Sequence, residues 1–490
     1  MGRPNVLFVT VDQWPGHLLG IEGHPVVETP TLDQLARNGV RFTRAYSECP
    51  ICIPARRTMM TGTDPRTHGD RVFQPALRMP DLPTLAGTFG AAGYQTFAVG
   101  KLHVYPPRDR IGFDDVLLAE EGRPHLGTVD DHDLFLADRG FPGRQFMHGM
   151  SNNDYAWRTW HLPEDCHVTN WATAQMCRTI KRRDPTRPAF WHLSYTHPHP
   201  PLVPLASYFE RYARREMDLP AMGDWAQDEA ALPAALRMVR HFWPALPPDA
   251  LADARRAFYA LCTHIDHQLR LVIGTLREEA LLDDTIILVT SDHGDLLGDH
   301  GLWAKRYLYD GSARVPMILV GPARGGLGHG RTDDHLVGLQ DVMPTLLDLA
   351  GIPAPDSCTG LSMVGGRRRE VLYAEALDGA KATRMVTDGP HKLIWYPAGN
   401  VIQLFDLARD PRELADRADD PAYAPVRRRL EEALVAALYG EDEAWIADGR
   451  LAGFPAPEVG PAPNRGLFGQ RGLHYPTPPL TDPGEVVGAA

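Results

Sequence analysis

Four short segments of the sequence place acids, bases and a cysteine where they could take part in a reaction. They are Asp12-Gln13, Cys52 to Arg56, Lys101-Leu102-His103 and Asp292-His293. Two further basic residues, His199 in "THPHPP" and Lys305 in "HGLWAKR", are candidates of the same kind. Together these residues offer metal ligands, fixed positive charges, acid–base groups and one sulfur nucleophile.

The first and last of these segments carry donors that suit a divalent cation. The donors belong to Asp12, Gln13, Asp292 and His293. Carboxylate and amide oxygens bind hard cations such as calcium, and an imidazole nitrogen also suits transition metals. The sequence therefore predicts one metal site built from two distant segments.

The remaining candidates are basic side chains. Arg56, Lys101 and Lys305 would supply fixed positive charge for an anionic group. His103 and His199 are candidates for the acid and the base of a proton transfer. A small anionic substrate is therefore expected, held in a local basic pocket of a chain whose net charge is −12.

Strands that end at these residues would bring them together. "NVLFVTVD" (5–12) is a β-branched apolar run, typical of a strand buried on both faces, and it ends at Asp12. "TFAVGK" reaches Lys101 in the same way, and "TIILVTS" precedes Asp292. Helical patterns alternate with these runs, which predicts an α/β fold with a large mixed, mostly parallel sheet flanked by helices. Ligands of such sheets bind beyond the carboxyl ends of the strands.

Composition and periodicity divide the chain into three predicted parts. Residues 1–369 carry the catalytic α/β pattern, with weakly periodic insertions at 104–190 that are rich in Pro, Asp and His. Residues 370–445 are predicted to form a small C-terminal α+β domain, with antiparallel strands before the helix "APVRRRLEEALVAAL". Residues 446–490 are predicted to be a Pro/Gly-rich arm, through which a homo-oligomer could form.

The bulk composition excludes several classes of protein. A hydrophobic content of 43% and a charged content of 23% are those of an ordinary globular protein. The net charge of −12 argues against a nucleic-acid partner. We expect a cytoplasmic location and no membrane partner, because the sequence shows neither a signal-peptide pattern nor an apolar run of membrane-spanning length. Six scattered cysteines are too few for a disulfide framework.

The motif around Cys52 resembles the signature of the formylglycine-dependent sulfatases, the arylsulfatase-like branch of the alkaline-phosphatase-like superfamily. "CIPAR" (52–56) and the following "TMMTG" (58–62) match the family's Cys-x-Pro-x-Arg pattern and its Thr-Gly sequel. Further family motifs occur in the family's order over roughly residues 4–440. They are "NVLFVTVDQ", "VGKLH", "THPHPP", "SDHGDLLGDHGLWAKR" and "QLFDLARDP".

The resemblance implies a sulfuric ester hydrolase that cleaves an aryl or alkyl sulfate. In this family a separate formylglycine-generating enzyme oxidises the signature cysteine, here Cys52, to an aldehyde that hydrates to a geminal diol. One hydroxyl of the diol attacks sulfur, and collapse through the other hydroxyl expels sulfate. A thiol would instead leave a thiosulfate ester, which is hard to cleave.

The resemblance also implies roles for the other candidates. It places Arg56 beside the diol, Lys101 and Lys305 on sulfate oxygens, His103 at the collapse of the diol and His199 at the leaving alcohol. The four predicted donors would share a single metal ion that lowers the pKa of the diol. Calcium is the usual metal of the family, and the imidazole among the donors leaves manganese or zinc open.

The chain departs from the family pattern in two places. Many sulfatases carry Asp-Asp at the first strand and Asp-Asn at the later one, where this chain has Asp-Gln and Asp-His. The polar residue expected shortly after the "HG" of 68–69 has no match, because Phe73 or Gln74 falls there. Arg57 is expected to be a solvated neighbour of the signature, and His197 a packing residue.

Three alternatives stay open beside this interpretation. A phosphonate monoester or phosphodiester hydrolase would share most motifs, but such relatives replace the Lys-x-His pair by neutral hydroxyl residues, whereas Lys101 and His103 are present here. A catalytically silent binding protein would keep the fold, but the intact Cys52 and Arg56 argue against it. A redox or zinc pair of Cys49 with Cys52 would lack a second close cysteine pair, and Cys49 is predicted to be a buried small hydrophobe.

Overall fold

The computed structural model describes residues 2–121, 128–150, 153–243, 245–323 and 327–460. Its strands are β1 (Asn5–Asp12), β2 (Val40–Phe42), β3 (Ala45–Tyr46), β4 (Gln95–Gly100), β5 (Asp115–Leu118), β6 (Ala189–Pro198), β7 (Thr285–Ser291), β8 (Met317–Val320), β9 (Arg331–Asp333), β10 (Val337–Gly338), β11 (Leu372–Ala376), β12 (Thr383–Thr387), β13 (His391–Tyr396), β14 (Val401–Asp406), β15 (Ile446–Ala447) and β16 (Arg450–Leu451). Its helices are α1 (Pro30–Asn38), α2 (Cys52–Thr61), α3 (Pro65–His68), α4 (Leu85–Ala91), α5 (Asp131–Asp138), α6 (Val168–Lys181), α7 (Ala206–Tyr212), α8 (Ala234–Phe242), α9 (Pro248–Glu278), α10 (Asp310–Ala313), α11 (Val342–Leu349) and α12 (Ala424–Ala437).

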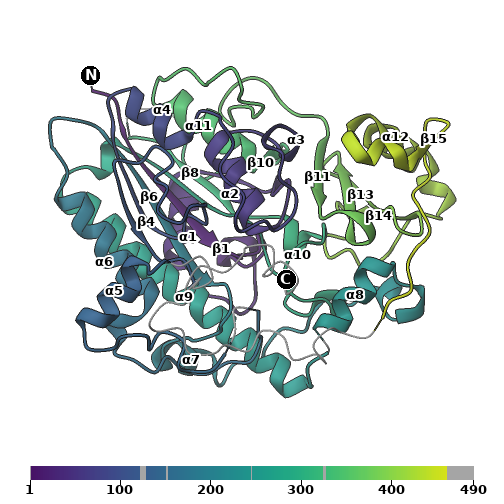
Figure 1. The fold of residues 1–490 in the computed structure, drawn as a ribbon, viewed down its shortest axis with the longest axis horizontal. Coiled ribbons are helices and arrows are strands. Elements are labelled where there is room, and N and C mark those ends of the chain that lie inside the picture. The colour runs from purple at the N-terminus through teal and green to yellow at the C-terminus, as the bar shows by residue number, and fades with distance from the viewer. Residues whose placement is uncertain (1, 122–127, 151–152, 244, 324–326, 461–490) are drawn as a thin grey trace.

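An eight-stranded sheet runs through the larger part of the molecule (Figure 1). Its strand order is β5-β4-β6-β1-β7-β8-β2-β9. The strands from β5 to β7 are parallel to one another, and β8 runs antiparallel to both of its neighbours, β7 and β2. This arrangement confirms the predicted fold class. Four of the parallel strands, β4, β6, β1 and β7, have their carboxyl ends at one common edge.

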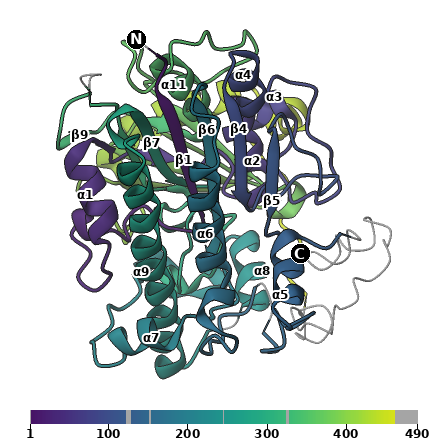
Figure 2. The same cartoon turned by 90° about the vertical axis from the view of Figure 1, so that its left-hand side faces the viewer.

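The central strand β1 is buried along its whole length because helices cover both faces of the sheet. Leu7, Val9 and Val11 pack with residues of α1, α6 and α9, whereas Val6 and Phe8 pack with residues of α2, α4 and α11. Figure 2 shows α6 and α9 lying across the first of these faces. A strand with apolar neighbours on both faces needs apolar residues at every position, which explains its continuous apolar sequence.

A second, antiparallel sheet of order β11-β12-β13-β14 follows near the C-terminal end (Figure 1). One face packs under α12 through Leu393, Trp395 and Leu430. The other face packs, through Met385 and Ile394, on α8 and on a segment before α10. The boundaries predicted at 370 and 446 stay predictions. A short hairpin, β15–β16, occupies residues 446–451, and residues 461–490 of the predicted arm lie outside the described residues.

The segment 104–190 is more regular than its composition suggests. β5 extends the sheet at its edge, and α6 packs Trp171, Ala172 and Met176 into the core beside β6 and α9. Buried threonines interrupt the apolar stripe of α6, since Thr169 and Thr173 also face inward. The two inward-facing threonines weaken the apolar periodicity of the helix in the sequence, although this face of the helix is buried.

No helix in the described ranges is long and apolar enough to cross a membrane.

Gly100 lies where β4 and β6 approach each other at the carboxyl edge. Its φ is +108°, and a Cβ at this position would lie 1.8 Å from the carbonyl oxygen of Ser194. Gly93, before the same strand, also has a positive φ of +91° but has open space around it.

Gly100→Ala is therefore expected to lower the free energy of unfolding by at least about 2 kcal/mol more than Gly93→Ala does. Both variants carry the backbone strain, and only the first adds the clash with Ser194. Urea denaturation measures the difference, and equal losses would show that the two strands separate at little cost.

Candidate active site

The carboxyl edge of the central sheet gathers the residues predicted from the sequence. Asp12 ends β1, Lys101 follows β4, His199 follows β6 and Asp292 follows β7. Cys52 is the first residue of α2, one of the helices that cover this sheet. Segments nearly 300 residues apart therefore meet because parallel strands end at a common edge.

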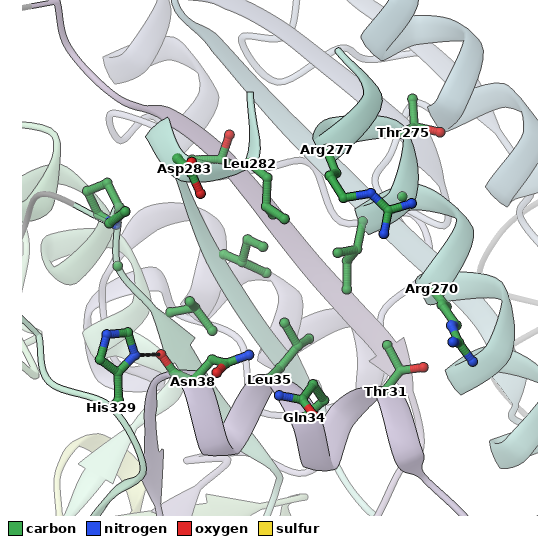
Figure 3. Close-up of a pocket in the computed structure, with 18 of the residues that line it drawn as sticks. Thr31, Gln34, Leu35, Asn38, Arg270, Thr275, Arg277, Leu282, Asp283 and His329 are labelled. Atoms are coloured by element: carbon green, nitrogen blue, oxygen red, sulfur yellow. Dashed lines mark hydrogen bonds between the residues drawn. The ribbon is translucent and has the colours of Figure 1, made fainter. Parts of the chain in front are cut away.

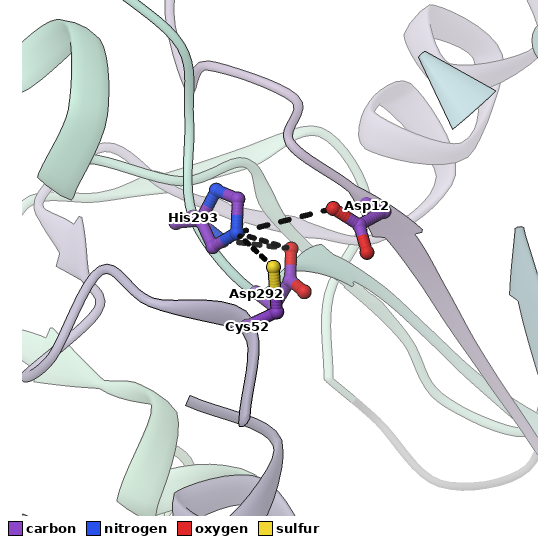
Figure 4. Close-up of side chains that lie close together, drawn as sticks. All are labelled: Asp12, Cys52, Asp292 and His293. Atoms are coloured by element: carbon purple, nitrogen blue, oxygen red, sulfur yellow. Dashed lines mark hydrogen bonds and ion pairs between the residues drawn. The ribbon is translucent and has the colours of Figure 1, made fainter. Parts of the chain in front are cut away.

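One cluster at this edge consists of Asp12, Cys52, Asp292 and His293 (Figure 4). Each residue offers a possible ligand atom, and these atoms all lie within 4.8 Å of one another. Cys52 Sγ lies 3.1 Å from His293 Nε2. The Oδ1 atom of Asp12 is buried and has no hydrogen-bond partner within the described residues. The cluster thus contains a charged oxygen that no protein donor there satisfies.

The imidazole of His293 is oriented as in a metal ligand. Its Nδ1 lies 3.0 Å from the carbonyl oxygen of Gly294, which can only accept, so Nδ1 carries the hydrogen and the lone pair is on Nε2. Burial lowers the pKa of His293 and so favours the neutral ring. Nε2 therefore presents a lone pair to the cluster while a carbonyl holds the other nitrogen.

Gln13 is held beside this cluster by residues that the sequence analysis did not single out. Its Nε2 donates to Asp295 Oδ2 and lies 3.2 Å from the hydroxyl of Tyr155, which itself donates to Asp295 over 2.5 Å. Its Oε1 accepts from Lys305 Nζ at 2.7 Å. The amide nitrogen is committed to the carboxylate, so the oxygen is the atom available to Lys305 or a cation. Asp295 lies within the "SDHGD" motif and could have been considered, whereas Tyr155 carries no signal.

Arg56 holds together four neighbouring strands of the central sheet, β4, β6, β1 and β7. Its Nε donates to Asp292 Oδ2 at 3.0 Å and its Nη2 to Asp12 Oδ2 at 3.1 Å. Its Nη1 donates to the carbonyl of Lys101 at 2.8 Å and to the hydroxyl of Ser194 at 2.9 Å. The guanidinium therefore holds two carboxylates of the cluster and the backbone of the Lys-x-His segment. Ser194, in the middle of an apolar strand, had no motif to mark it.

Lys101 is fully buried between two carboxylates. Its Nζ lies 2.5 Å from Asp12 Oδ2 and also contacts Glu121 Oε1. Burial alone would lower the pKa of Lys101, but the two carboxylates raise it above its ordinary value. Burial alone would likewise raise the pKa of Asp12, but Lys101, His199 and Arg56 hold it well below its ordinary value. Both groups are therefore charged at neutral pH.

The two histidines of "THPHPP" have different surroundings. His199 Nδ1 donates to the carbonyl of Pro200 at 2.7 Å and lies 3.4 Å from Glu121 Oε1. The Nδ1 of His197 lies 3.0 Å from the carbonyl oxygen of His199, and its ring packs 5.1 Å from that of His167. Burial lowers the pKa of His197 to about 4. His199 is thus the histidine next to the charged groups, and His197 packs against its own segment and His167, the residue before α6.

His103 is placed by a sharp turn after Lys101. Its φ is +62°, and its backbone N–H donates to Glu120 Oε1 at 2.8 Å, as does the N–H of Leu102. Its ring lies edge-to-face on Phe73, with 5.9 Å between centroids. Phe73 and Gln74 occupy the position where the sequence has no match to the family. Phe73 contacts His103, and Gln74 donates to the carboxylate of Asp70.

The expectation that Arg57 is solvated is wrong. Arg57 is 3% exposed, its Nε lies 3.2 Å from Asp70 Oδ2, and its Nη1 donates to the carbonyl of Arg78 at 2.8 Å. All ten residues of α2 are buried, so a charge on any face of this helix must be paired inside the protein. Cys49 is fully buried, as predicted.

A separate groove of about 1160 Å³ lies between α1 and the C-terminal half of α9 (Figure 3). Leu35, Arg270 and Arg277 are among its lining residues, together with Thr285 at the start of β7. None of the predicted site residues lines it. The groove therefore belongs to the amino edge of the sheet, opposite the candidate active site.

The mostly parallel sheet and the charged cluster at its carboxyl edge define a hydrolase of the alkaline-phosphatase-like superfamily. The family model described as "Sulfatase" matches residues 4–352, which is more than half of the chain. A second model, "N-sulphoglucosamine sulphohydrolase, C-terminal", matches residues 298–439. The chain belongs to the sulfatase family.

Individual relatives agree with this family over most of their length. An arylsulfatase of Clostridium perfringens is 34% identical over 475 residues, covering 92% of this chain and 98% of that protein. A choline-sulfatase of Rhizobium meliloti is 32% identical over 443 residues, covering 86% of this chain and 83% of that protein. Among solved structures, a phosphonate monoester hydrolase of Agrobacterium radiobacter matches with a TM-score of 0.78 and 26% identity, covering 89% of this chain and 95% of that one.

Proposed function

We propose that the protein hydrolyses an aryl or alkyl sulfate ester through formylglycine formed from Cys52, with the help of one divalent metal ion. The observation that carries the proposal is the position of Cys52, which begins α2 and lies 3.1 Å from His293 Nε2 within the charged cluster. Asp12, Arg56 and Lys101 surround this position with fixed charges. A formylglycine-generating enzyme would be the maturation partner.

In the proposed reaction one hydroxyl of the hydrated aldehyde at position 52 loses its proton to solvent, its oxygen attacks sulfur, and the bond from sulfur to the alcohol oxygen breaks. Lys101 and Lys305 hold sulfate oxygens as charge develops on them. His199 protonates the leaving oxygen from Nε2, because a backbone carbonyl holds its Nδ1 hydrogen. His103 then takes the proton of the remaining hydroxyl, whose collapse to the aldehyde breaks the carbon–oxygen bond and releases sulfate.

The donor set of the cluster fits a divalent cation. Asp12, Gln13, Asp292 and His293 would hold it, and the unpartnered Asp12 Oδ1 and the Nε2 lone pair of His293 are the atoms that support this. A cation bound there would polarise a sulfate oxygen and lower the pKa of the nucleophilic hydroxyl. The oxygen donors favour calcium, and the imidazole keeps manganese and zinc as alternatives.

A phosphonate monoester or phosphodiester hydrolase is the second candidate. The structural similarity to the Agrobacterium radiobacter enzyme favours it, at a TM-score of 0.78. Lys101 and His103 favour sulfate, because they offer two cationic or acid–base groups next to the nucleophile. The cytoplasmic location and a homo-oligomer formed through the C-terminal arm stay predictions.

Peptide mass spectrometry tests the nucleophile directly. The tryptic peptide of residues 45–56, from protein made in a host with the maturing enzyme, contains both Cys49 and Cys52. Cys52 is expected to have lost sulfur and gained oxygen, while Cys49 alkylates as a thiol. Turnover of para-nitrophenyl sulfate, alkyl sulfates and phosphodiesters then ranks the substrates. A Cys52 that alkylates like Cys49, with no turnover of any ester, would contradict the proposal and favour a silent binding protein.

Asp295→Asn is expected to weaken metal binding by about 10- to 100-fold. One carboxylate oxygen accepts from the backbone N–H groups of Leu297 and Ala304, and the other accepts from Gln13 Nε2. The single oxygen of an Asn would face the backbone donors and its NH2 group would face Gln13, so that the Gln13 oxygen turns away from the cluster. Calorimetric titration of metal-stripped protein with calcium or manganese measures the change.

Tyr155→Phe is the matched control for this prediction. It removes the hydroxyl that donates to Asp295 but keeps the carboxylate on Gln13, so its effect on metal affinity is expected to be within about threefold. Equal affinities of Asp295→Asn and the wild-type protein would show that Gln13 is not a ligand held by Asp295.

A further inference from the structure

Glu121 is a buried acid at the candidate site that none of the sequence motifs includes. It follows β5, is 7% exposed and has a φ of +60°. A non-glycine residue in the left-handed region is held there by its surroundings, and such residues gather at functional sites.

The carboxylate of Glu121 joins two basic side chains that follow different strands. Its Oε1 contacts Lys101 Nζ, after β4, and lies 3.4 Å from His199 Nδ1, after β6. Burial alone would raise the pKa of Glu121, but the positive charges of His199 and Lys101 lower it to about 2, so it is a carboxylate at neutral pH. One oxygen atom thus fixes the relative position of both side chains.

The neighbouring acid, Glu120, has a different partner set. It accepts the backbone N–H groups of Leu102 and His103, both at 2.8 Å. Two consecutive acids after β5 therefore hold the Lys-x-His segment in two ways, Glu120 through the backbone and Glu121 through a side chain. Glu121 also lies beside His199, the histidine that follows β6.

The contacts of His199 define which of its nitrogens can transfer a proton. Its Nδ1 donates to the carbonyl of Pro200, which cannot donate in return, so Nδ1 keeps its hydrogen in both charge states of the ring. The mobile proton is on Nε2. A carboxylate beside the Nδ1–H fixes the orientation of the ring, as carboxylates do beside catalytic histidines.

We propose that Glu121 is a positioning residue that holds His199 for protonation of the leaving alcohol. This inference rests on the proposed ester hydrolysis. The proton moves from His199 Nε2 to the leaving oxygen as the sulfur–oxygen bond breaks, and Glu121 neither gains nor loses a proton.

Glu121→Gln tests the inference through the leaving group. A para-nitrophenolate needs little protonation, so kcat/KM for para-nitrophenyl sulfate is expected to fall by about 10-fold or less, whereas that for an unactivated alkyl sulfate falls by about 10²- to 10³-fold. A merely structural role would reduce the amount of folded enzyme and lower both values by the same factor. Equal factors would therefore overturn the inference.

A double variant and a binding measurement complete the test. In a His199→Ala background, Glu121→Gln is expected to cost less than about threefold on the alkyl sulfate, because the residue it positions is gone. Inorganic sulfate should bind to Glu121→Gln at least as tightly as to the wild-type enzyme by calorimetry, since a negative charge has been removed. Independent losses in the double variant, or sulfate binding weakened by about 10-fold, would overturn the inference.

Failure of the proposed function gives a different result. A wild-type enzyme that cleaves phosphodiesters and no sulfate ester would contradict the proposed function, and the same aryl-to-alkyl comparison on phosphodiesters would then decide the role of Glu121. A wild-type enzyme that turns over no ester and binds no inorganic sulfate would contradict both.

Discussion

Cys52→Ala is expected to abolish ester hydrolysis, with kcat/KM falling by about 10⁴-fold or more. The variant cannot form the aldehyde, and the other residues of the cluster, two aspartates and a histidine, cannot be converted to formylglycine. Thermal stability should stay nearly unchanged, because the Sγ atom contacts His293 while Arg56, four residues along α2, keeps the contacts that connect the strands. Turnover of para-nitrophenyl sulfate and a thermal unfolding curve measure the two effects.

Cys49→Ala is the matched control for this variant. Cys49 is also fully buried, lies three residues earlier and belongs to a separate small apolar cluster. It is expected to keep activity within about twofold, with a modest loss of stability. Comparable activity of Cys52→Ala and the wild-type enzyme would remove the nucleophile assignment.

Lys101→Ala is expected to lower the cleavage of sulfate esters by about 10²- to 10³-fold and that of phosphodiesters by about 10-fold or less. A sulfate ester has three non-bridging oxygens, whereas in a phosphodiester one of these positions carries the second ester group. A lysine that contacts the third oxygen has no equivalent partner in the diester. The ratio of the two kcat/KM values is the quantity to measure.

The stability of Lys101→Ala needs its own control. Removing a buried ammonium leaves Asp12 and Glu121 with less counter-charge, so the variant should also unfold at a lower temperature. Arg369→Ala removes another partly buried cation, which is paired with Asp341 away from the candidate site. It should lower stability without changing the ratio of sulfate to phosphodiester cleavage. An unchanged ratio in Lys101→Ala would mean that the Lys-x-His argument for sulfate does not hold.

The sequence was a good guide wherever a functional residue ends a buried strand. The apolar runs before Asp12, Lys101 and Asp292 predicted a mostly parallel sheet, and such a sheet has one carboxyl edge, so the convergence of these side chains followed from the fold class. Cys52 was found differently, through a motif at the start of a helix.

The residues that hold these side chains in place could not be predicted in the same way. Glu121 and Tyr155 lie between the helices and strands of the segment 104–190, and Ser194 lies inside a strand. Their roles depend on distances across the edge of the sheet, which no local pattern encodes. For Arg57 the expectation itself was wrong. A charged residue in a helix is usually predicted to be exposed, and the sequence does not reveal that α2 is buried on every side.

The packing of the C-terminal sheet on the segment that follows Lys305 limits how freely this part of the chain can be exchanged between relatives. Lys392 of β13 contacts Asp310, and the Tyr309 hydroxyl donates to Gln403 of β14 at 2.6 Å. The sheet therefore supports the stretch of backbone that places Lys305 on Gln13. A C-terminal sheet taken from another relative, in evolution or in chimera design, would therefore need side chains that fit residues 305–310. A poor fit there would displace the Lys305 ammonium in the candidate active site.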